Sequence, residues 1–179
     1  MLRIDIPRSE LWDEVNEEYV YIDKQTLQLE HSLVSISKWE SKWHKPFLSE
    51  KQKTRSEILD YIRCMTITQN VNPNVYLGFT NVLIDKVNKY IEDPMTATTF
   101  REDKKRSSRE IITSELIYYW MVAYGIPFEC QKWHLNRLLT LIRICGIKNQ
   151  EPKKMSKKDI MGKNAAINAM RRSKMHSRG

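Results

Sequence analysis

The sequence contains little glycine, proline or cysteine, and each scarcity excludes a class of protein. Five glycines and six prolines in 179 residues argue against a loop-rich all-β fold. The three cysteines are odd in number and scattered, which predicts free thiols in a reducing compartment rather than a disulfide framework. The N-terminal stretch lacks the apolar segment of a signal peptide, and we therefore expect a cytoplasmic site of synthesis.

The chain also lacks the short motifs that mark common catalytic sites. It has no phosphate-binding loop, no dinucleotide-binding glycine pattern, no zinc-protease helix and no esterase nucleophile elbow. Cys130 and His134 lie four residues apart and could share one metal on a helix. Structural zinc needs four ligands, however, and no second pair follows in the sequence. We therefore predict a protein that is not an enzyme, with no catalytic residue, no metal and no cofactor.

Positive charge is concentrated at one end of the chain. Residues 148–179 carry ten basic and two acidic side chains, which account for the whole net charge of +8 and leave the other residues neutral. We expect a flexible basic tail with a short helix from Ser156 to about Arg172. It could bind nucleic acid, tether an acidic protein or only solubilise the chain, and it lacks aromatic residues on which bases could stack. The candidate contacts are Lys153, Lys154, Lys157, Lys158, Arg171 and Arg172.

The remaining residues show two kinds of periodicity. Alternation predicts a strand at Leu2–Ile6, and β-favouring residues predict a small hairpin or sheet from Tyr19–Ile22 and Thr26–Leu29. Helical spacing then predicts three helices before residue 100. They run from about Ser32 to His44, from a capping box at Thr54 and Glu57 to about Ile67, and from Thr80 to Ile91.

The longest apolar stretch, residues 111–149, predicts a pair of helices at the centre of the core. A capping-box spacing at Ser107 and Glu110 precedes the first helix, Arg109–Tyr124. The second helix is Pro127–Cys145, it is apolar nearly all round, and Gly146 should end it. Its two segments are too short and too interrupted to cross a membrane. The packed face of the first helix should be Ile112, Leu116, Tyr119, Trp120 and Ala123.

These patterns together predict a mainly α fold. Residues 1–147 should form a small helical domain of about five helices with a minor N-terminal β element, and residues 148–179 should form the basic tail.

Three phrases of the sequence resemble a family of phage proteins. They are LEHSLVSISKWESKW, ITSELIYYWMVAYGIPFECQKWHLNRLLTLIRICGIKNQ and EPKKMSKKDIMGKNAAINAMRRSKMHSRG. Similar small proteins are encoded among the tail genes of long-tailed bacteriophages and are regarded as tail assembly chaperones. The resemblance implies a non-catalytic protein in the infected bacterial cytoplasm that binds the tape-measure protein, tail-tube subunits or both during tail morphogenesis.

Aromatic residues on the predicted helices are the candidates for contact with a protein partner. We expect Trp39, Trp43, Tyr118, Trp133 and Arg137 at or near the interaction surface, although all of them could instead belong to the core. A homo-oligomer is also open. Two alternative functions remain, a nucleic-acid-associated phage protein that acts through its basic tail and a virion structural subunit such as a head–tail connector.

Overall fold

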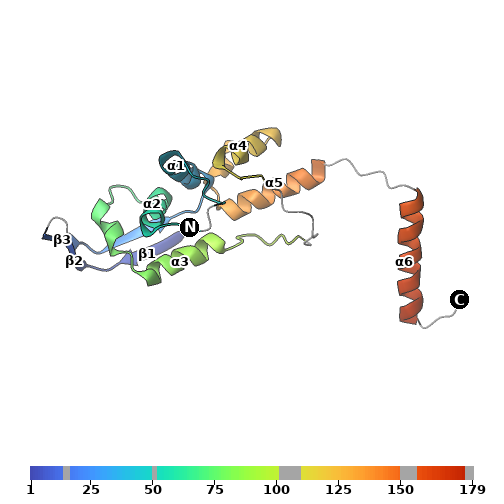
Figure 1. The fold of residues 1–179 in the computed structure, drawn as a ribbon, viewed down its shortest axis with the longest axis horizontal. Helices are drawn as coiled ribbons and strands as arrows, with labels where there is room; N and C mark the ends of the chain where they lie inside the picture. Colours follow the sequence, from blue (N-terminus) through green and yellow to red (C-terminus); the bar gives the residue numbers. More distant parts are fainter. Residues whose placement is uncertain (14–16, 50–51, 101–109, 150–156, 176–179) are drawn as a thin grey trace. The chain divides into compact units, whose positions relative to one another are not determined.

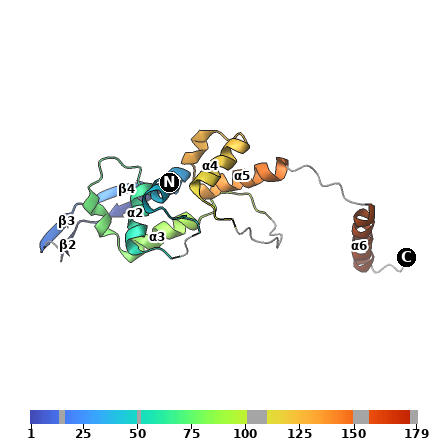
Figure 2. The same ribbon diagram turned by 45° about the horizontal axis from the view of Figure 1, so that its top comes forward.

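The structure is a computed structural model that describes residues 1–13, 17–49, 52–100, 110–149 and 157–175. The chain divides into two compact units, Met1–Gly146 and Ile147–Gly179. The first unit contains a single core of strands and helices, and Figures 1 and 2 show its elements from two sides. In the second unit the structure describes residues 147–149 and one helix, α6 (Lys157–Met175).

Four short strands occupy most of the first 29 residues. They are β1 (Leu2–Ile6), β2 (Ser9–Asp13), β3 (Glu18–Ile22) and β4 (Gln25–Leu29). Strand β1 pairs antiparallel with β4, and β2 pairs antiparallel with β3, so each sheet has two strands. In Figures 1 and 2 the β2–β3 pair extends away from the helices.

The two sheets are successive parts of one antiparallel ribbon. Ile6 lies opposite Gln25 and Ser9 lies opposite Ile22, so that two residues separate the paired positions in each strand. The register of pairing is therefore the same on both sides of the break. Pro7 lies at this break, and its ring nitrogen has no hydrogen to donate to the ladder.

The predicted fold class is wrong, because the chain is mixed α and β rather than mainly α. Strand β2 was not predicted, since Leu11 and Trp12 are adjacent apolar residues and break the alternation that marks a strand. Tyr19–Ile22 and Thr26–Leu29 were predicted as a possible hairpin, but β3 and β4 pair with β2 and β1 instead of with each other. Such long-range pairing leaves no local trace in the sequence.

Five α-helices and two 3-10 helices follow the strands among the described residues up to Asn149. They are α1 (Leu33–Trp43), α2 (Arg55–Met65), η1 (Pro73–Gly78), α3 (Asn81–Glu92), α4 (Ser114–Ala123), η2 (Phe128–Lys132) and α5 (Leu135–Asn149). The predicted capping box of α2 is confirmed, since the Thr54 hydroxyl accepts from the Glu57 N–H and the Glu57 carboxylate accepts from the Thr54 N–H. Ser32 caps α1 in the same way with Ser35.

The core lies between one face of the β1–β4 sheet and the helices. Ile4, Ile6, Leu27 and Leu29 alternate along the two strands and are almost completely buried. Backbone hydrogen bonds from Glu30 to Met65 and from Ile67 to Gln28 attach β4 to the end of α2. The helices contribute further buried residues, among them Leu33, Ile36, Ile62, Val87, Ile117, Met121, Leu135 and Leu138.

The predicted pair of central helices needs three corrections. Helix α4 begins at Ser114 with Thr113 as its cap, not at Arg109, and the segment around Ser107 lies outside the described residues. The second helix is divided, because η2 is separated from α5 by Trp133 and His134. Gly146 does not end α5, which continues to Asn149. Glycine stops a helix only where the chain turns into the left-handed conformation, and Gly146 stays helical.

Two histidines lie in the centre of this core. The rings of His31 and His134 meet edge to face with centroids 5.1 Å apart. His31 Nδ1 shares a hydrogen bond with the Tyr61 hydroxyl, and His134 Nε2 lies 3.0 Å from the Tyr90 carbonyl oxygen. Burial, with a smaller contribution from His134, lowers the pKa of His31 from 6.5 to about 3. His31 is therefore neutral in the folded protein and joins β4 to α2.

Acidification should destabilise the fold through His31. An unfolded chain binds a proton at His31 below pH 6.5, whereas the folded chain binds it only near pH 3, so the free energy of unfolding falls between these values. At pH 5 the loss should be about 2 kcal/mol relative to pH 7. Urea unfolding at both pH values should show this loss in the wild type and a smaller one in His31→Asn.

The comparison of the two pH values should not extend below pH 5, because the protonation of Glu57 would then also change the free energy of unfolding. Hydrogen bonds from the Lys45 ammonium and the Thr54 N–H lower the pKa of Glu57 from 4.5 to about 2. Its stabilising contribution is present above pH 4.5 and is lost only below that value. An equal pH dependence of wild type and His31→Asn between pH 7 and pH 5 would contradict the assignment to His31.

Candidate functional site

The two tryptophans predicted on one face of α1 do share it, and this face packs against α2. Trp39 is completely buried and its Nε1 donates to the Glu57 carbonyl oxygen at 2.9 Å. Trp43 stacks on it with ring centroids 6.1 Å apart, is half-buried, and donates from Nε1 to Asp60 at 2.9 Å. Trp39 is thus a core residue rather than a contact for a partner, and Trp43 serves the contact between α1 and α2.

The other three predicted contact residues lie around η2. The Tyr118 hydroxyl donates to Gln131 Oε1 at 2.8 Å, and burial raises the pKa of this hydroxyl. The Arg137 guanidinium lies over the Trp133 ring at 4.3 Å from its centroid. Trp133 is half-buried and Arg137 is exposed, so both reach the surface.

Helix α4 presents a more exposed apolar face than any of these residues. Tyr119 and Val122 are each 65% exposed and lie three residues apart, on one side of the helix. Phe128, at the start of η2, is 54% exposed. We call Tyr119, Val122 and Phe128 the α4–η2 face. Figures 1 and 2 show α4 on the outside of the first unit, where it packs against α1.

The prediction of the packed side of α4 was wrong. Tyr119 and Ala123 were expected in the core, whereas the buried residues are Ser114, Ile117 and Met121. Because α4 is apolar almost all round, periodicity predicts a helix there but cannot choose which side it buries. The same composition means that packing one side of α4 leaves large apolar side chains in solvent.

A second exposed apolar surface lies on the β2–β3 ribbon. Trp12 opposes Tyr19 with ring centroids 4.9 Å apart, and the next pair on the same face is Glu10 and Tyr21. Trp12, Tyr19 and Tyr21 are between 52% and 60% exposed. We call Glu10, Trp12, Tyr19 and Tyr21 the aromatic face of the ribbon. The sequence did not reveal this face, because its two strands come together only through the pairing of β2 with β3.

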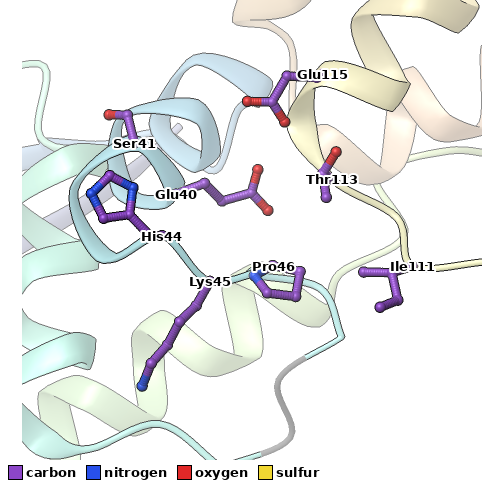
Figure 3. A pocket seen from close by; sticks show the side chains of 8 residues that line it. All are labelled: Glu40, Ser41, His44, Lys45, Pro46, Ile111, Thr113 and Glu115. Carbon is purple, nitrogen blue, oxygen red and sulfur yellow. The ribbon is translucent and has the colours of Figure 1, made fainter.

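A hollow lies between α1 and α4, and polar and apolar residues both line it (Figure 3). It has a volume of about 370 Å³. Its central carboxylate, Glu40, extends from α1 toward the start of α4 (Figure 3) and accepts hydrogen bonds from the backbone N–H groups of Phe47 and Ser114, at 2.8 and 2.7 Å. Lys45 donates to Glu57 at 2.8 Å. Glu40 therefore fastens α4 to α1, which is a structural task.

A larger hollow of about 610 Å³ lies between α2 and α3. Its walls are mainly apolar and aromatic, with Phe47, Tyr61 and Ile91 among them. The Lys53 ammonium donates to the Phe47 carbonyl oxygen at 2.9 Å. Burial raises the pKa of the Tyr61 hydroxyl, which therefore stays protonated. Glu92 also lines this hollow.

Within the part of the chain that the structure describes, no group of three or more His, Cys, Asp or Glu residues could hold a metal ion. None of the helices among the described residues has the length and hydropathy needed to cross a membrane.

The predicted tail contacts are only partly described. Lys153 and Lys154 lie outside the described residues, and for Lys157 and Lys158 the structure describes only the helical backbone. Arg171 and Arg172 are exposed on α6, as are all its described side chains from residue 161 to residue 175. A helix was predicted here from Ser156 to about Arg172, and α6 confirms it with slightly different ends.

Comparisons with protein-family models, with curated proteins and with solved structures gave no significant match. The function must therefore be argued from the surfaces of the molecule.

Replacing Glu40 should test the attachment of α4. In Glu40→Gln one carboxylate oxygen becomes an NH₂ group, which cannot accept from a backbone N–H, and one buried donor loses its partner. We expect a loss of about 1 to 3 kcal/mol in the free energy of unfolding, measured in urea. The matched change Glu115→Gln, in the first turn of α4 but exposed, should cost less, about 0.3 to 1 kcal/mol. Equal losses would show that Glu40 is not the link.

Proposed function

We propose that this chain is a non-catalytic binding protein that holds an apolar helix of a protein partner against the α4–η2 face. Following the resemblance of its sequence to tail assembly chaperones, we further propose that the partner is a tape-measure protein or a tail-tube subunit of a long-tailed bacteriophage. A tape-measure protein is the better candidate, since its long apolar helices need a cover before the tail is assembled.

The observation that carries this proposal is the exposure of Tyr119 and Val122 on a helix whose opposite side is completely buried. Large exposed apolar patches on a folded protein are typical of interaction sites. Side chains three residues apart on one helix form the ridge that another helix packs against. Residues 1–147 have no net charge, so the attraction would come from burial of apolar surface rather than from electrostatic steering.

The position of the face on the molecule also favours binding. Glu40 holds the start of α4 through the Ser114 N–H, and Met121 and Ile117 pack its inner side in the core. The exposed side chains therefore stand on a rigid helix, and little conformational entropy is lost when a partner covers them.

Co-purification with a tape-measure protein tests the proposed function. The tagged full-length chain, expressed together with such a protein, should retain it after washing and keep it in the supernatant after centrifugation. Failure of the wild-type chain to do either, when the tape-measure protein is expressed and detected, would refute the chaperone function.

A pair of valine substitutions tests the surface. Val122→Ser removes apolar area from the α4–η2 face, whereas Val82→Ser removes the same area from α3, where Val82 is also 65% exposed. We expect Val122→Ser to weaken partner binding about ten-fold, which corresponds to about 1.4 kcal/mol, and Val82→Ser to leave it unchanged. Titration by fluorescence anisotropy measures both, and circular dichroism should show that both remain folded. Equal affinities would remove the α4–η2 face from the proposal.

The basic helix supports a second candidate function, the binding of nucleic acid. Lys163, Arg171, Arg172 and Lys174 project into solvent from α6, and such side chains bind phosphates by releasing counterions. Affinity for a labelled DNA duplex should then fall steeply as salt is raised. In Arg171→Gln/Arg172→Gln the slope of log affinity against log salt should decrease by about two. Binding that ignores salt, or an unchanged slope, would exclude this function for α6.

A further inference from the structure

The β2–β3 ribbon combines exposed aromatic rings with a concentration of negative charge. From Ser9 to Ile22 the sequence has five acidic residues and no basic residue. The side chains of Glu10, Glu17 and Glu18 are exposed, and within the described residues their carboxylates make no hydrogen bond or ion pair. Among the described residues, the ribbon therefore presents three carboxylates without a partner near Trp12 and Tyr19.

This charge restricts what the aromatic face can bind. Exposed aromatic rings could stack with bases or enter a membrane surface, but carboxylates repel phosphates and anionic lipids. A second ribbon is also a poor partner, because two segments of the same negative charge would be brought together. A cationic protein segment fits best, since ammonium and guanidinium groups are attracted both to the aromatic faces and to the carboxylates.

Such a segment is present in the same sequence. One face of α6 carries five side chains whose spacing of three or four residues is that of a helix, except that two of them are adjacent. They are Lys163, Ile167, Met170, Arg171 and Lys174. All five side chains are exposed. We call them the basic–apolar face of α6. It offers three cations, and Ile167 and Met170 add apolar atoms between them.

We propose that the aromatic face of the β2–β3 ribbon binds the basic–apolar face of α6 from a second copy of this chain. Met170 packs against aromatic rings, Arg171 lies over a ring face, and Lys163 and Lys174 approach the carboxylates at its border. Each of these contacts is weak when exposed to solvent, and the association therefore depends on protein concentration and on salt.

The two binding faces differ, and this decides the kind of assembly. An interface between unlike surfaces joins subunits head to tail, so that each added copy leaves one free ribbon and one free helix. The products are open chains or closed rings rather than a simple symmetric dimer. This inference uses neither the α4–η2 face nor any property of a tail protein, and it stands or falls independently of the proposed function.

Light scattering of the full-length chain after gel filtration provides the first test. The weight-average mass should rise above 21.4 kDa as the protein concentration increases, and should return to that value in about 1 M salt, where charges are screened beyond about 3 Å. A monomer at every concentration in dilute salt would overturn the proposal.

Charge reversal identifies the surfaces. One variant carries Glu10→Lys, Glu17→Lys and Glu18→Lys on the ribbon, and the other carries Lys163→Glu, Arg171→Glu and Lys174→Glu on α6. Each variant alone should remain monomeric. Mixed in equal amounts they should associate again, because the unaltered helix of the first variant meets the unaltered ribbon of the second, and the two reversed surfaces also carry opposite charges.

The mixture also separates the proposal from its competitors. Self-association that persists in either variant, or a mixture that stays monomeric, would overturn it. All substituted side chains are exposed, and circular dichroism together with urea unfolding should show that both variants fold like the wild type. Trp12→Ala, which keeps every charge, should also weaken association, whereas Trp12→Phe, which keeps a ring, should weaken it less. Equal association of all three proteins would show that the aromatic face takes no part.

Discussion

The pairing of β1 with β4 is the constraint on which the rest of the first unit depends. It joins residues that are 19 to 27 positions apart in the sequence and places Ile4, Ile6, Leu27 and Leu29 on one surface. That surface is the one to which α2 is attached through Met65 and to which the core residues of the other helices pack. Isolated helices of ten to fifteen residues are marginal in water, so the helices need this common surface to persist.

The exposed surfaces follow from what this core cannot cover. Helix α4 has one side in the core and is apolar on the other, and the β2–β3 ribbon extends beyond the layer of helices. Helix α6 has charged and apolar side chains and no described side chain that is buried. Three surfaces thus remain with three different chemistries, and each favours a different kind of partner, an apolar helix, a cationic segment and an anionic or aromatic surface.

Helices were more predictable from the sequence than strands, and the reasons lie in particular residues. The Thr54–Glu57 spacing marks the start of α2, because a cap is made within four residues. The pairing of β2 with β3 continues the pairing of β1 with β4, which no local sequence pattern marks. In β2 the adjacent apolar residues Leu11 and Trp12 also conceal the alternation that is typical of a strand. Thr113 caps α4 in place of the predicted Ser107, since both have the required side chain and only the tertiary link to Glu40 selects one.

The candidate sites were less predictable than the fold. Trp39 and Trp43 have the spacing of a shared face, but a sequence does not show whether that face meets solvent or another helix. Here it meets α2, where the Glu57 carbonyl and the Asp60 carboxylate accept from the two indoles. Tyr119 has the spacing of a packed face as well, but α4 is apolar almost all round and buries its other side. The concentration of charge in residues 148–179 was evident from composition alone, because charge is a property of the residues and not of their packing.

The unchanged register across Pro7 makes the end of the ribbon an exchangeable part. The same two-residue spacing in both strands means that β2, its connection and β3 could be replaced by another hairpin, or shortened by equal numbers of residues in each strand, while Ile6 still faces Gln25. The core residues of β1 and β4 would keep their sides of the sheet. Only Ile22, which is buried at the base of the ribbon, would need to be kept. A chain with this construction can change what it recognises at the tip without altering the pairing that holds it together.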